Sequence, residues 1–204
     1  MFLGGYYKLE NVLIFGLSGK SNFHGKHFTT TPSRWGRWYY LKSNIEYIDN
    51  LKDRRLLIKI ADIRLSDPHR DISEIENELT EQGKSILKMI KQTNPLEIKK
   101  LIAKQSDIFK FTLKQMSPSK YLKGLRNSKV FLGHASSDPL IPFSESFYFR
   151  EHLKKVGGKP SFIMLNVLSH VNIVNRKITV KNVIFLYLPE LLKMVDFIKE
   201  IINA

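Results

Sequence analysis

The segment from Lys129 to Pro142, K-V-F-L-G-H-A-S-S-D-P-L-I-P, constrains the fold of this chain most strongly. Its apolar start, residues 130–132, is typical of a strand buried on both faces. Small and polar residues follow, and Asp138-Pro139 ends the segment in a turn. Open α/β sheets place their sites at the carboxyl ends of their strands. The segment therefore predicts an α/β protein with a site at Asp138.

A second apolar run, residues 161–168, predicts a further strand and leads into Ser169-His170. Residues 143–156 between the two runs are expected to form a helix that Gly157-Gly158 ends. Two successive strands thus offer an acid, Asp138, and then a base, His170, each at a carboxyl end.

The order strand, H-G-x-x-D-x-x-x-P, helix, strand, S-H resembles the C-terminal third of the α/β-hydrolases. Here the motif runs from His134 to Pro142, with Ala135 where that family usually has glycine. The resemblance implies that Asp138 orients the imidazole of His170, which activates a nucleophilic serine. His134 is assigned to the turn at the strand end and not to catalysis.

The first residues extend the resemblance. Gly4-Gly5-Tyr6-Tyr7, followed by Leu9-Glu10-Asn11-Val12, resembles the place where those enzymes close the strand after the nucleophile helix and open a helical cap. The resemblance implies a strand end over residues 1–7, a helical cap over 8–116 and the C-terminal part of the core over 117–204. It also implies a partial α/β-hydrolase fold with about three parallel strands and one exposed sheet edge. The serine elbow and the oxyanion-hole loop would be missing.

Ser18 leaves an alternative open. Gly16-Leu17-Ser18-Gly19-Lys20 nearly spells the G-x-S-x-G elbow, so a shortened hydrolase could use Ser18. Lys20, however, stands where the elbow needs glycine, and the pattern is also typical of a helix that ends at a glycine. Gly19-Lys20-Ser21 resembles the end of a phosphate loop. Only two residues separate Gly16 from Gly19, however, and a phosphate loop needs four there for its backbone to wrap a phosphate. No cofactor is therefore expected.

Apolar residues recur at helical spacing over most of the remaining chain. The expected helices cover residues 36–48, 53–63, 71–93, 96–105, 106–116 and 183–202, the last one interrupted at Pro189. Residues 22–32 are polar and show no helical pattern. The aromatic group Trp38-Tyr39-Tyr40 could line an acyl pocket or simply pack a helix on the body of the protein.

Charge and composition exclude several classes. The 33 Lys and Arg against 19 acidic residues give a net charge of +14, but the lysines are scattered, which favours a solvated basic surface over a nucleic-acid interface. His24, His27 and His69 lack carboxylates at metal spacing, so no metal site is expected.

Residues 183–202 are too charged to span a membrane. The absence of cysteine and of a signal-peptide pattern predicts a cytoplasmic protein.

The chemistry implied by the resemblance is hydrolysis of an ester, thioester or amide in a small acyl substrate, through an acyl-enzyme. Without the elbow serine the chain alone is expected to be an inactive, truncated hydrolase. The alternative is a non-catalytic binding or regulatory remnant, which would associate through its exposed sheet edge. The acyl group, the leaving group, the oligomeric state and the existence of a separate N-terminal half stay open.

Overall fold

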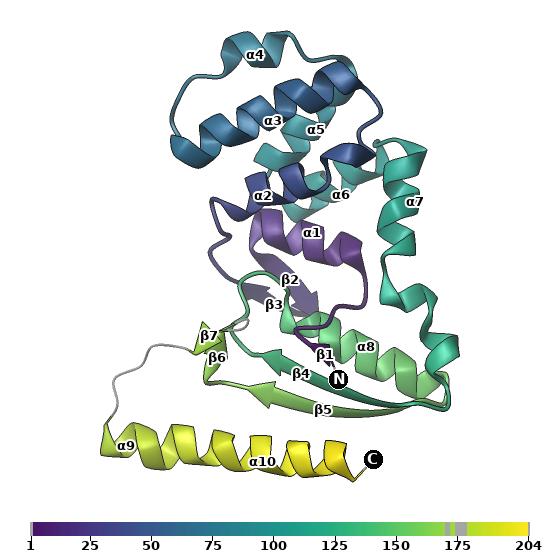
Figure 1. Cartoon of the computed structure of the whole chain (residues 1–204), viewed down its shortest axis with the longest axis vertical. Coiled ribbons are helices and arrows are strands. Elements are labelled where there is room, and N and C mark those ends of the chain that lie inside the picture. Colours follow the sequence, from purple (N-terminus) through teal and green to yellow (C-terminus); the bar gives the residue numbers. More distant parts are fainter. Residues whose placement is uncertain (1, 170–171, 174–178, 204) are drawn as a thin grey trace. The chain divides into compact units, whose positions relative to one another are not determined.

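The computed structural model of the chain describes residues 2–169, 172–173 and 179–203. It is a mixed α/β structure (Figure 1). The chain divides into two compact units, which we call the sheet unit (Met1–Val12 with Ser117–Ala204) and the helical unit (Leu13–Met116). The sequence analysis predicted these divisions after residues 7 and 116, and the structure has them after residues 12 and 116.

The sheet unit is built on three parallel strands within the described residues. Their order is β1 (Phe2–Leu3), β4 (Lys129–Ala135) and β5 (Lys159–Leu165), with β4 in the centre. Every residue of β4 pairs with one of β5, from Lys129 with Lys159 to Ala135 with Leu165. The apolar run that predicted one strand over 161–168 ends its parallel ladder at Leu165. A short antiparallel pair follows, β6 (Leu168–Ser169) with β7 (Asn172–Ile173).

One face of this sheet is covered by α8 (Phe143–Lys155), as the sequence predicted. Val130 and Leu132 of β4 pack there against Phe149 and Leu153 of the helix. The two strand residues share a face because side chains alternate along a strand. Gly157 follows the helix with φ +90°, a conformation that favours glycine and stops the helix.

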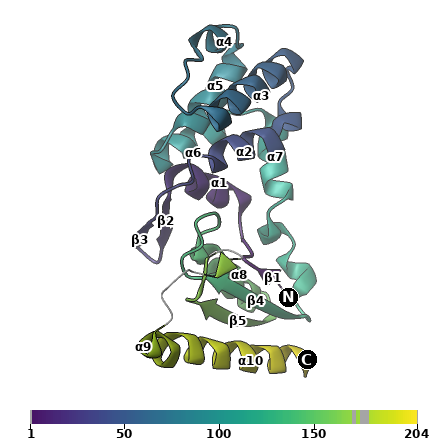
Figure 2. The ribbon, with the colours of Figure 1, turned by 60° about the vertical axis from the view of Figure 1, so that its left-hand side comes forward.

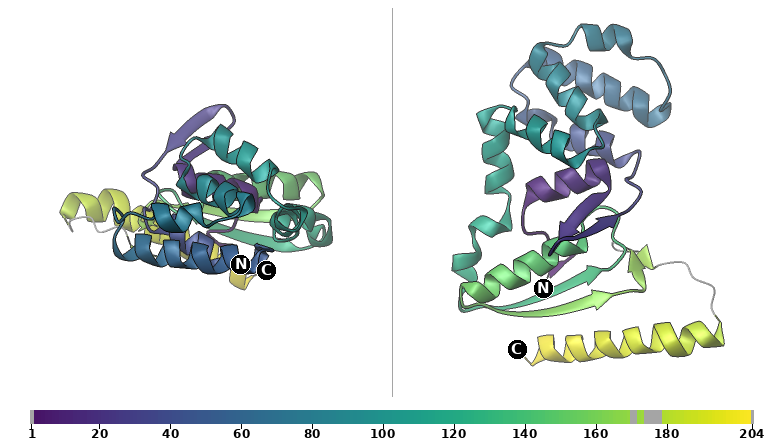
Figure 3. Two further views of the ribbon diagram at one scale, coloured as in Figure 1. Left: turned by 90° about the horizontal axis from the view of Figure 1, so that it is seen from above. Right: turned by 180° about the vertical axis from the view of Figure 1, so that it is seen from behind.

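The opposite face is covered by α10 (Leu188–Ile202). Figure 3 shows α8 and α10 on the two sides of the strands. Phe131, the alternate residue of β4, meets Phe197 of α10 edge to face, with ring centroids 5.9 Å apart. Two short segments precede α10, α9 (Val180–Asn182) and the π-helical η4 (Val183–Tyr187).

Pro189 lies in the first turn of α10, directly after the π-helical η4, and the backbone on both sides of it is helical. The interruption expected at this proline is a change from π-helical to α-helical turns. Within the described ranges, no helix combines the length and the apolar character that crossing a membrane requires.

The helical unit begins inside α1 (Leu9–Ser18) and continues with a hairpin (Figure 2). Its strands are β2 (Lys20–Phe23) and β3 (Lys26–Thr29), joined by His24 and Gly25, both with positive φ. Two such residues form the type I′ turn, whose twist matches that of the strands. The sequence analysis had left residues 22–32 without regular structure. The hairpin was missed because its strands are polar, so they lack the apolar alternation of a half-buried strand.

Helices make up the rest of this unit. They are α2 (Gly36–Ser43), η1 (Ile45–Tyr47), α3 (Leu51–Ser66), α4 (Ser73–Asn77), α5 (Glu81–Lys91), α6 (Pro95–Ala103) and α7 (Asp107–Gln115), and the 3₁₀ turns η2 (Pro118–Lys120) and η3 (Leu122–Leu125) lead back to the sheet unit. Asn94 and Ser106 cap α6 and α7 with their side chains. Leu57, Ile60, Leu87 and Ile98 are fully buried in the common core.

The single helix predicted over residues 71–93 is wrong, because two helices occupy this segment. The chain breaks before Thr80, which caps α5 by accepting from the backbone N–H of Gly83. Asp53 of α3 is fully buried behind this cap and accepts from the backbone N–H of Thr80 at 3.0 Å and from its hydroxyl. An acidic partner distant in sequence thus decides where α5 starts.

Candidate functional site

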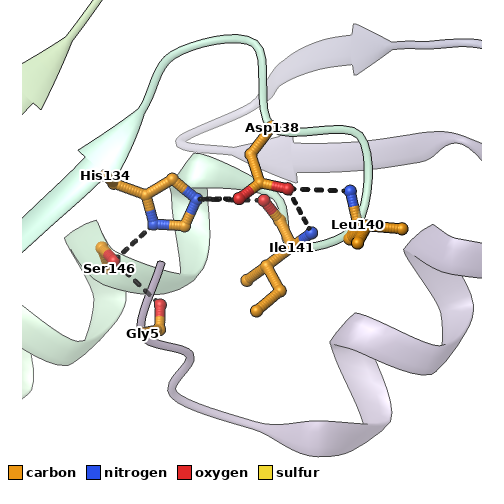
Figure 4. Close-up of polar contacts among 6 residues, drawn as sticks. All are labelled: Gly5, His134, Asp138, Leu140, Ile141 and Ser146. Atoms are coloured by element: carbon orange, nitrogen blue, oxygen red, sulfur yellow. Dashed lines mark hydrogen bonds and ion pairs between the residues drawn. The ribbon is translucent and has the colours of Figure 1, made fainter. Parts of the chain in front are cut away.

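Asp138 lies just beyond the carboxyl end of β4, and its side chain is buried. Its Oδ1 atom accepts hydrogen bonds from the backbone N–H groups of Leu140, at 2.8 Å, and Ile141, at 3.0 Å (Figure 4). Pro139, which lies between Asp138 and Leu140, has no N–H to donate. The turn therefore holds the carboxylate in one orientation with its own backbone.

His134, the penultimate residue of β4, is buried beside this turn. Its Nε2 atom lies 3.0 Å from the carbonyl oxygen of Ile141 and 3.8 Å from Oδ2 of Asp138. Its Nδ1 atom lies 2.6 Å from Oγ of Ser146 on α8. The ring thus ties the strand end to the turn and to the covering helix, which fits its assignment to the strand-end turn.

Ser146 links the ring of His134 to the segment after β1. The single hydroxyl proton of Ser146 is donated to the carbonyl of Gly5, at 2.8 Å, so Oγ is left to accept from Nδ1 of His134. The carbonyl of Ile141 can only accept, so it pairs with Nε2 when that nitrogen carries a proton.

His170, the predicted base, lies outside the described residues. The segment leading to it is described, however. The last residues of β4 and β5, Ala135 and Leu165, are paired, and the N–H of Ser136 donates to Leu165 at 2.9 Å. The turn that carries Asp138 and the segment that leads to His170 therefore leave the sheet from adjacent positions, at the carboxyl ends of β4 and β5.

Ser18 is the last residue of α1, so it does not lie on a strand-to-helix turn. Its buried hydroxyl donates to the carbonyl of Ile14 at 2.7 Å and accepts from the N–H of Lys20 at 3.1 Å. Gly19 follows with φ +69°. The prediction of a helix that ends at a glycine is confirmed, and the elbow geometry that the alternative required is absent at Ser18.

Sequence analysis missed Glu145, a buried carboxylate in the first turn of α8. Its Oε2 atom accepts from the backbone N–H groups of Tyr7, at 3.0 Å, and Lys8, at 2.7 Å, and its Oε1 atom accepts from the side-chain amide of Asn11 at 2.8 Å. Burial raises the pKa of Glu145, and the hydrogen bonds from Lys8, Asn11 and Tyr7 oppose that rise.

Glu145 therefore anchors the segment after β1 to the helix that follows the Asp138 turn. Its only sequence signal was an acidic residue in the first turn of a helix, which is too common to single out a residue.

In the helical unit the buried carboxylate of Asp53 is engaged by Thr80 at the start of α5. Trp38 is buried in the helical core, whereas Tyr39 is 60% exposed, so the aromatic group packs one helix and does not form a continuous lining. The lysines of the open hollow between α4 and α5 include Lys84 and Lys91, which pair with Glu81 and Glu76. No group of three or more metal-ligating side chains occurs in the described part of the chain.

Comparison of the chain with models of protein families, with curated proteins and with solved structures found no match.

Proposed function

We propose that this chain supplies the acid and the base of a serine hydrolase of the α/β-hydrolase class, with the helical unit as its cap. Asp138 orients the imidazole of His170, and His170 takes the proton from an attacking serine. The substrates are small molecules that contain an ester, thioester or amide bond. The proposal depends most on one observation, the in-register parallel pairing of β4 with β5 up to Ala135 and Leu165.

The fixed carboxylate of Asp138 supports the acid role. An acid that orients an imidazole has to keep its own position, and here two backbone N–H groups hold Oδ1. Ionised carboxylates accept about two hydrogen bonds per oxygen, so this arrangement is compatible with an imidazole N–H as a further donor. Burial excludes water that would compete for such a bond.

The nucleophile is not supplied by a recognisable elbow in this sequence, which contains no G-x-S-x-G motif. Ser18 is engaged at a helix end. Each missing oxyanion donor weakens the stabilisation of the transition state by about 3 kcal/mol. The chain by itself is therefore expected to be inactive, and activity requires a segment that carries the serine and the oxyanion donors.

Engineered cysteines test the geometry, because the chain has no cysteine of its own. The double variant Asp138→Cys/His170→Cys should form an internal disulfide, which requires Cα atoms within about 7 Å. The matched control, Lys129→Cys/His170→Cys, should not, because Lys129 lies at the other end of β4, about 20 Å away at the rise of a strand. Mass spectrometry after mild oxidation measures disulfide formation in the double variant and in the control.

The exposed neighbour Ser137 provides a second pair that leaves the Asp138 turn intact, Ser137→Cys/His170→Cys. Circular dichroism checks that the variants fold. If neither pair near the turn forms a disulfide while the protein is folded, the acid–base proposal is wrong.

Activity provides the second test. The purified chain should give no burst with nitrophenyl acetate and no labelling by a fluorophosphonate probe. Labelling that disappears in Ser18→Ala would contradict the proposal. Labelling that requires a separately produced segment with a G-x-S-x-G motif would support it.

An alternative proposal is a non-catalytic binding or regulatory protein that associates through the sheet edge. It is favoured by β1, which within the described residues pairs only with β4 and so forms an edge strand. The alternative requires no proximity of residues 138 and 170, so the disulfide test also separates the two proposals.

A further inference from the structure

Helix α10 has three distinct faces. The face on the sheet consists of Glu190, Met194, Phe197 and Ile201. A second face carries the exposed charged residues Lys193, Asp196 and Glu200. The third, which we call the apolar stripe, consists of Leu188, Leu191, Leu192, Val195, Ile198 and Ile202, each between 38% and 76% exposed.

The spacing within the apolar stripe indicates what kind of element covers it. Leu188, Leu191, Val195, Ile198 and Ile202 follow one another at intervals of 3, 4, 3 and 4 residues. This is the a/d repeat of a coiled coil, in which each apolar residue packs between residues of a facing helix. A helix that only covers a sheet needs one apolar face, and α10 has that face already in Phe197 and its neighbours. The second stripe therefore fits a second helix.

We propose that the apolar stripe pairs with the same stripe of a second copy of this chain, in an antiparallel two-fold dimer. A two-fold axis beside residue 193 places Leu188 opposite Ile198 of the partner subunit and Leu191 opposite Val195 of the partner subunit. Each a position then meets a d position, and the charged face stays outside the contact. Such an interface is self-complementary, as two-fold symmetry requires. In the antiparallel arrangement the positive end of each helix dipole also lies beside the negative end of the other, which is favourable.

The size of the stripe is sufficient for a dimer. Its six residues expose on the order of 600 Å² per chain, so that two copies would bury about 1,200 Å², the lower limit of stable protein interfaces. The preceding turns add further apolar surface, with Phe185 75% and Ile184 50% exposed. An apolar patch of this size is at the upper end of what monomeric proteins expose.

The charge of α10 favours a protein partner over a membrane surface. The helix carries two lysines, Lys193 and Lys199, and three acids, Glu190, Asp196 and Glu200, which give it a charge of −1 in a chain of +14. Helices that lie on anionic membranes have a polar face rich in lysine and arginine instead. A nearly neutral helix also lets two copies of a basic chain approach each other with little repulsion.

Analytical ultracentrifugation of the full chain, over about 1 to 100 µM, tests the dimer. The unsubstituted chain should sediment as a dimer in that range. Leu191→Glu and Val195→Glu should each raise the dissociation constant at least about tenfold, since they bury a charge in the centre of the interface. The matched control is Leu96→Glu, which changes a 70% exposed leucine of α6 and should leave the dimer unchanged.

All three residues are exposed, so circular dichroism should show native helix content in each variant. A chain that stays monomeric throughout the range, or a dimer that both stripe variants leave intact, would refute the proposal. So would a folded monomer that binds anionic phospholipid vesicles through residues 191 and 195.

Single cysteines test the orientation. A mixture of Leu191→Cys and Val195→Cys chains should form a mixed disulfide dimer. Leu188→Cys alone should not cross-link, because the antiparallel alignment separates its two copies by ten residues, about 15 Å along the helix. Efficient cross-linking of Leu188→Cys to itself would indicate parallel helices and overturn the antiparallel arrangement.

Discussion

The two helices that cover the sheet each carry a buried glutamate in their first turn, but the two carboxylates are held differently. Glu145 of α8 accepts hydrogen bonds from the backbone N–H groups of Tyr7 and Lys8 and from the side-chain amide of Asn11. Glu190 of α10 accepts from the backbone N–H and the side-chain amide of Asn166, and also from the ammonium group of Lys193 at 2.7 Å.

This difference contributes to the direction of each pKa. Burial raises the pKa of Glu145, and neither its amide donors nor the charge of Lys8 compensates. Burial opposes the ionisation of Glu190 as well, but the hydrogen bonds from Lys193 and Asn166 outweigh it and lower the pKa of Glu190. A buried acid at the same position in a helix can thus favour either protonation state, depending on how strongly burial acts on it and on whether a cation donates a hydrogen bond to it directly.

The largest effect is expected for Glu145→Ala. It leaves two backbone N–H groups and the amide of Asn11 without their acceptor beside the core, at about 1 to 3 kcal/mol for each buried group. We expect the free energy of unfolding, measured by urea denaturation, to fall by about 3 to 5 kcal/mol. Glu145→Gln retains one acceptor oxygen and should cost less than half as much. Equal losses in the two variants would show that these hydrogen bonds do not hold the segment after β1.

Glu190→Ala should cost less, about 1 to 2 kcal/mol, because its partners are closer to solvent. The side chain of Lys193 is 52% exposed, so water replaces part of what the ion pair contributes. The control Lys193→Ala should therefore change the free energy of unfolding by less than about 1 kcal/mol. A loss in Glu190→Ala as large as that in Glu145→Ala would mean that the two helices are held equally.

Stability should depend on pH with opposite sign at the two glutamates. The raised pKa of Glu145 means that its contribution is present below the ordinary pKa of glutamate and is lost as pH rises through the raised value. The lowered pKa of Glu190 means that its contribution is present above the ordinary pKa and is lost as pH falls through the lowered value.

Unfolding free energies of the unsubstituted chain, Glu145→Gln and Glu190→Gln, measured from about pH 3 to about pH 7, test this contrast. Relative to Glu145→Gln the unsubstituted chain should lose stability with rising pH, and relative to Glu190→Gln it should gain stability. Two differences that slope in the same direction would contradict the assignment.

The smallest effect concerns the ends of the helices. α8 is followed by Gly157 with φ +90°, whereas α10 ends at Asn203 with φ −90°. Gly157→Ala should lower the free energy of unfolding by about 1 kcal/mol, because alanine is strained at positive φ. Gly124→Ala is the control, since its added Cβ meets no atom within 4 Å, and Asn203→Ala tests the end of α10. Both should stay within about 0.5 kcal/mol of the unsubstituted chain.

Elements with local signals were predictable. Asn94-Pro95 and Ser106 marked the starts of α6 and α7, and Gly19 and Gly157 marked the ends of α1 and α8. The split between α4 and α5 was not, because Thr80 depends on Asp53, 27 residues earlier in the chain. The turn at Asp138 was recognisable from its sequence, whereas the contact of His134 with Ser146 and the three donors of Glu145 were not.

The sequence by itself determined the elements whose causes lie within a few residues, such as caps, glycine ends, apolar periodicity and the Asp-Pro turn at the end of β4. Only the tertiary structure decided which buried polar groups meet, because Glu145 and its donors at Tyr7 and Lys8 are 138 and 137 residues apart in the chain. It also decided which apolar face of α10 is used by the sheet. Both faces have helical spacing, and packing against Phe131 selects the one with Phe197, leaving the apolar stripe exposed.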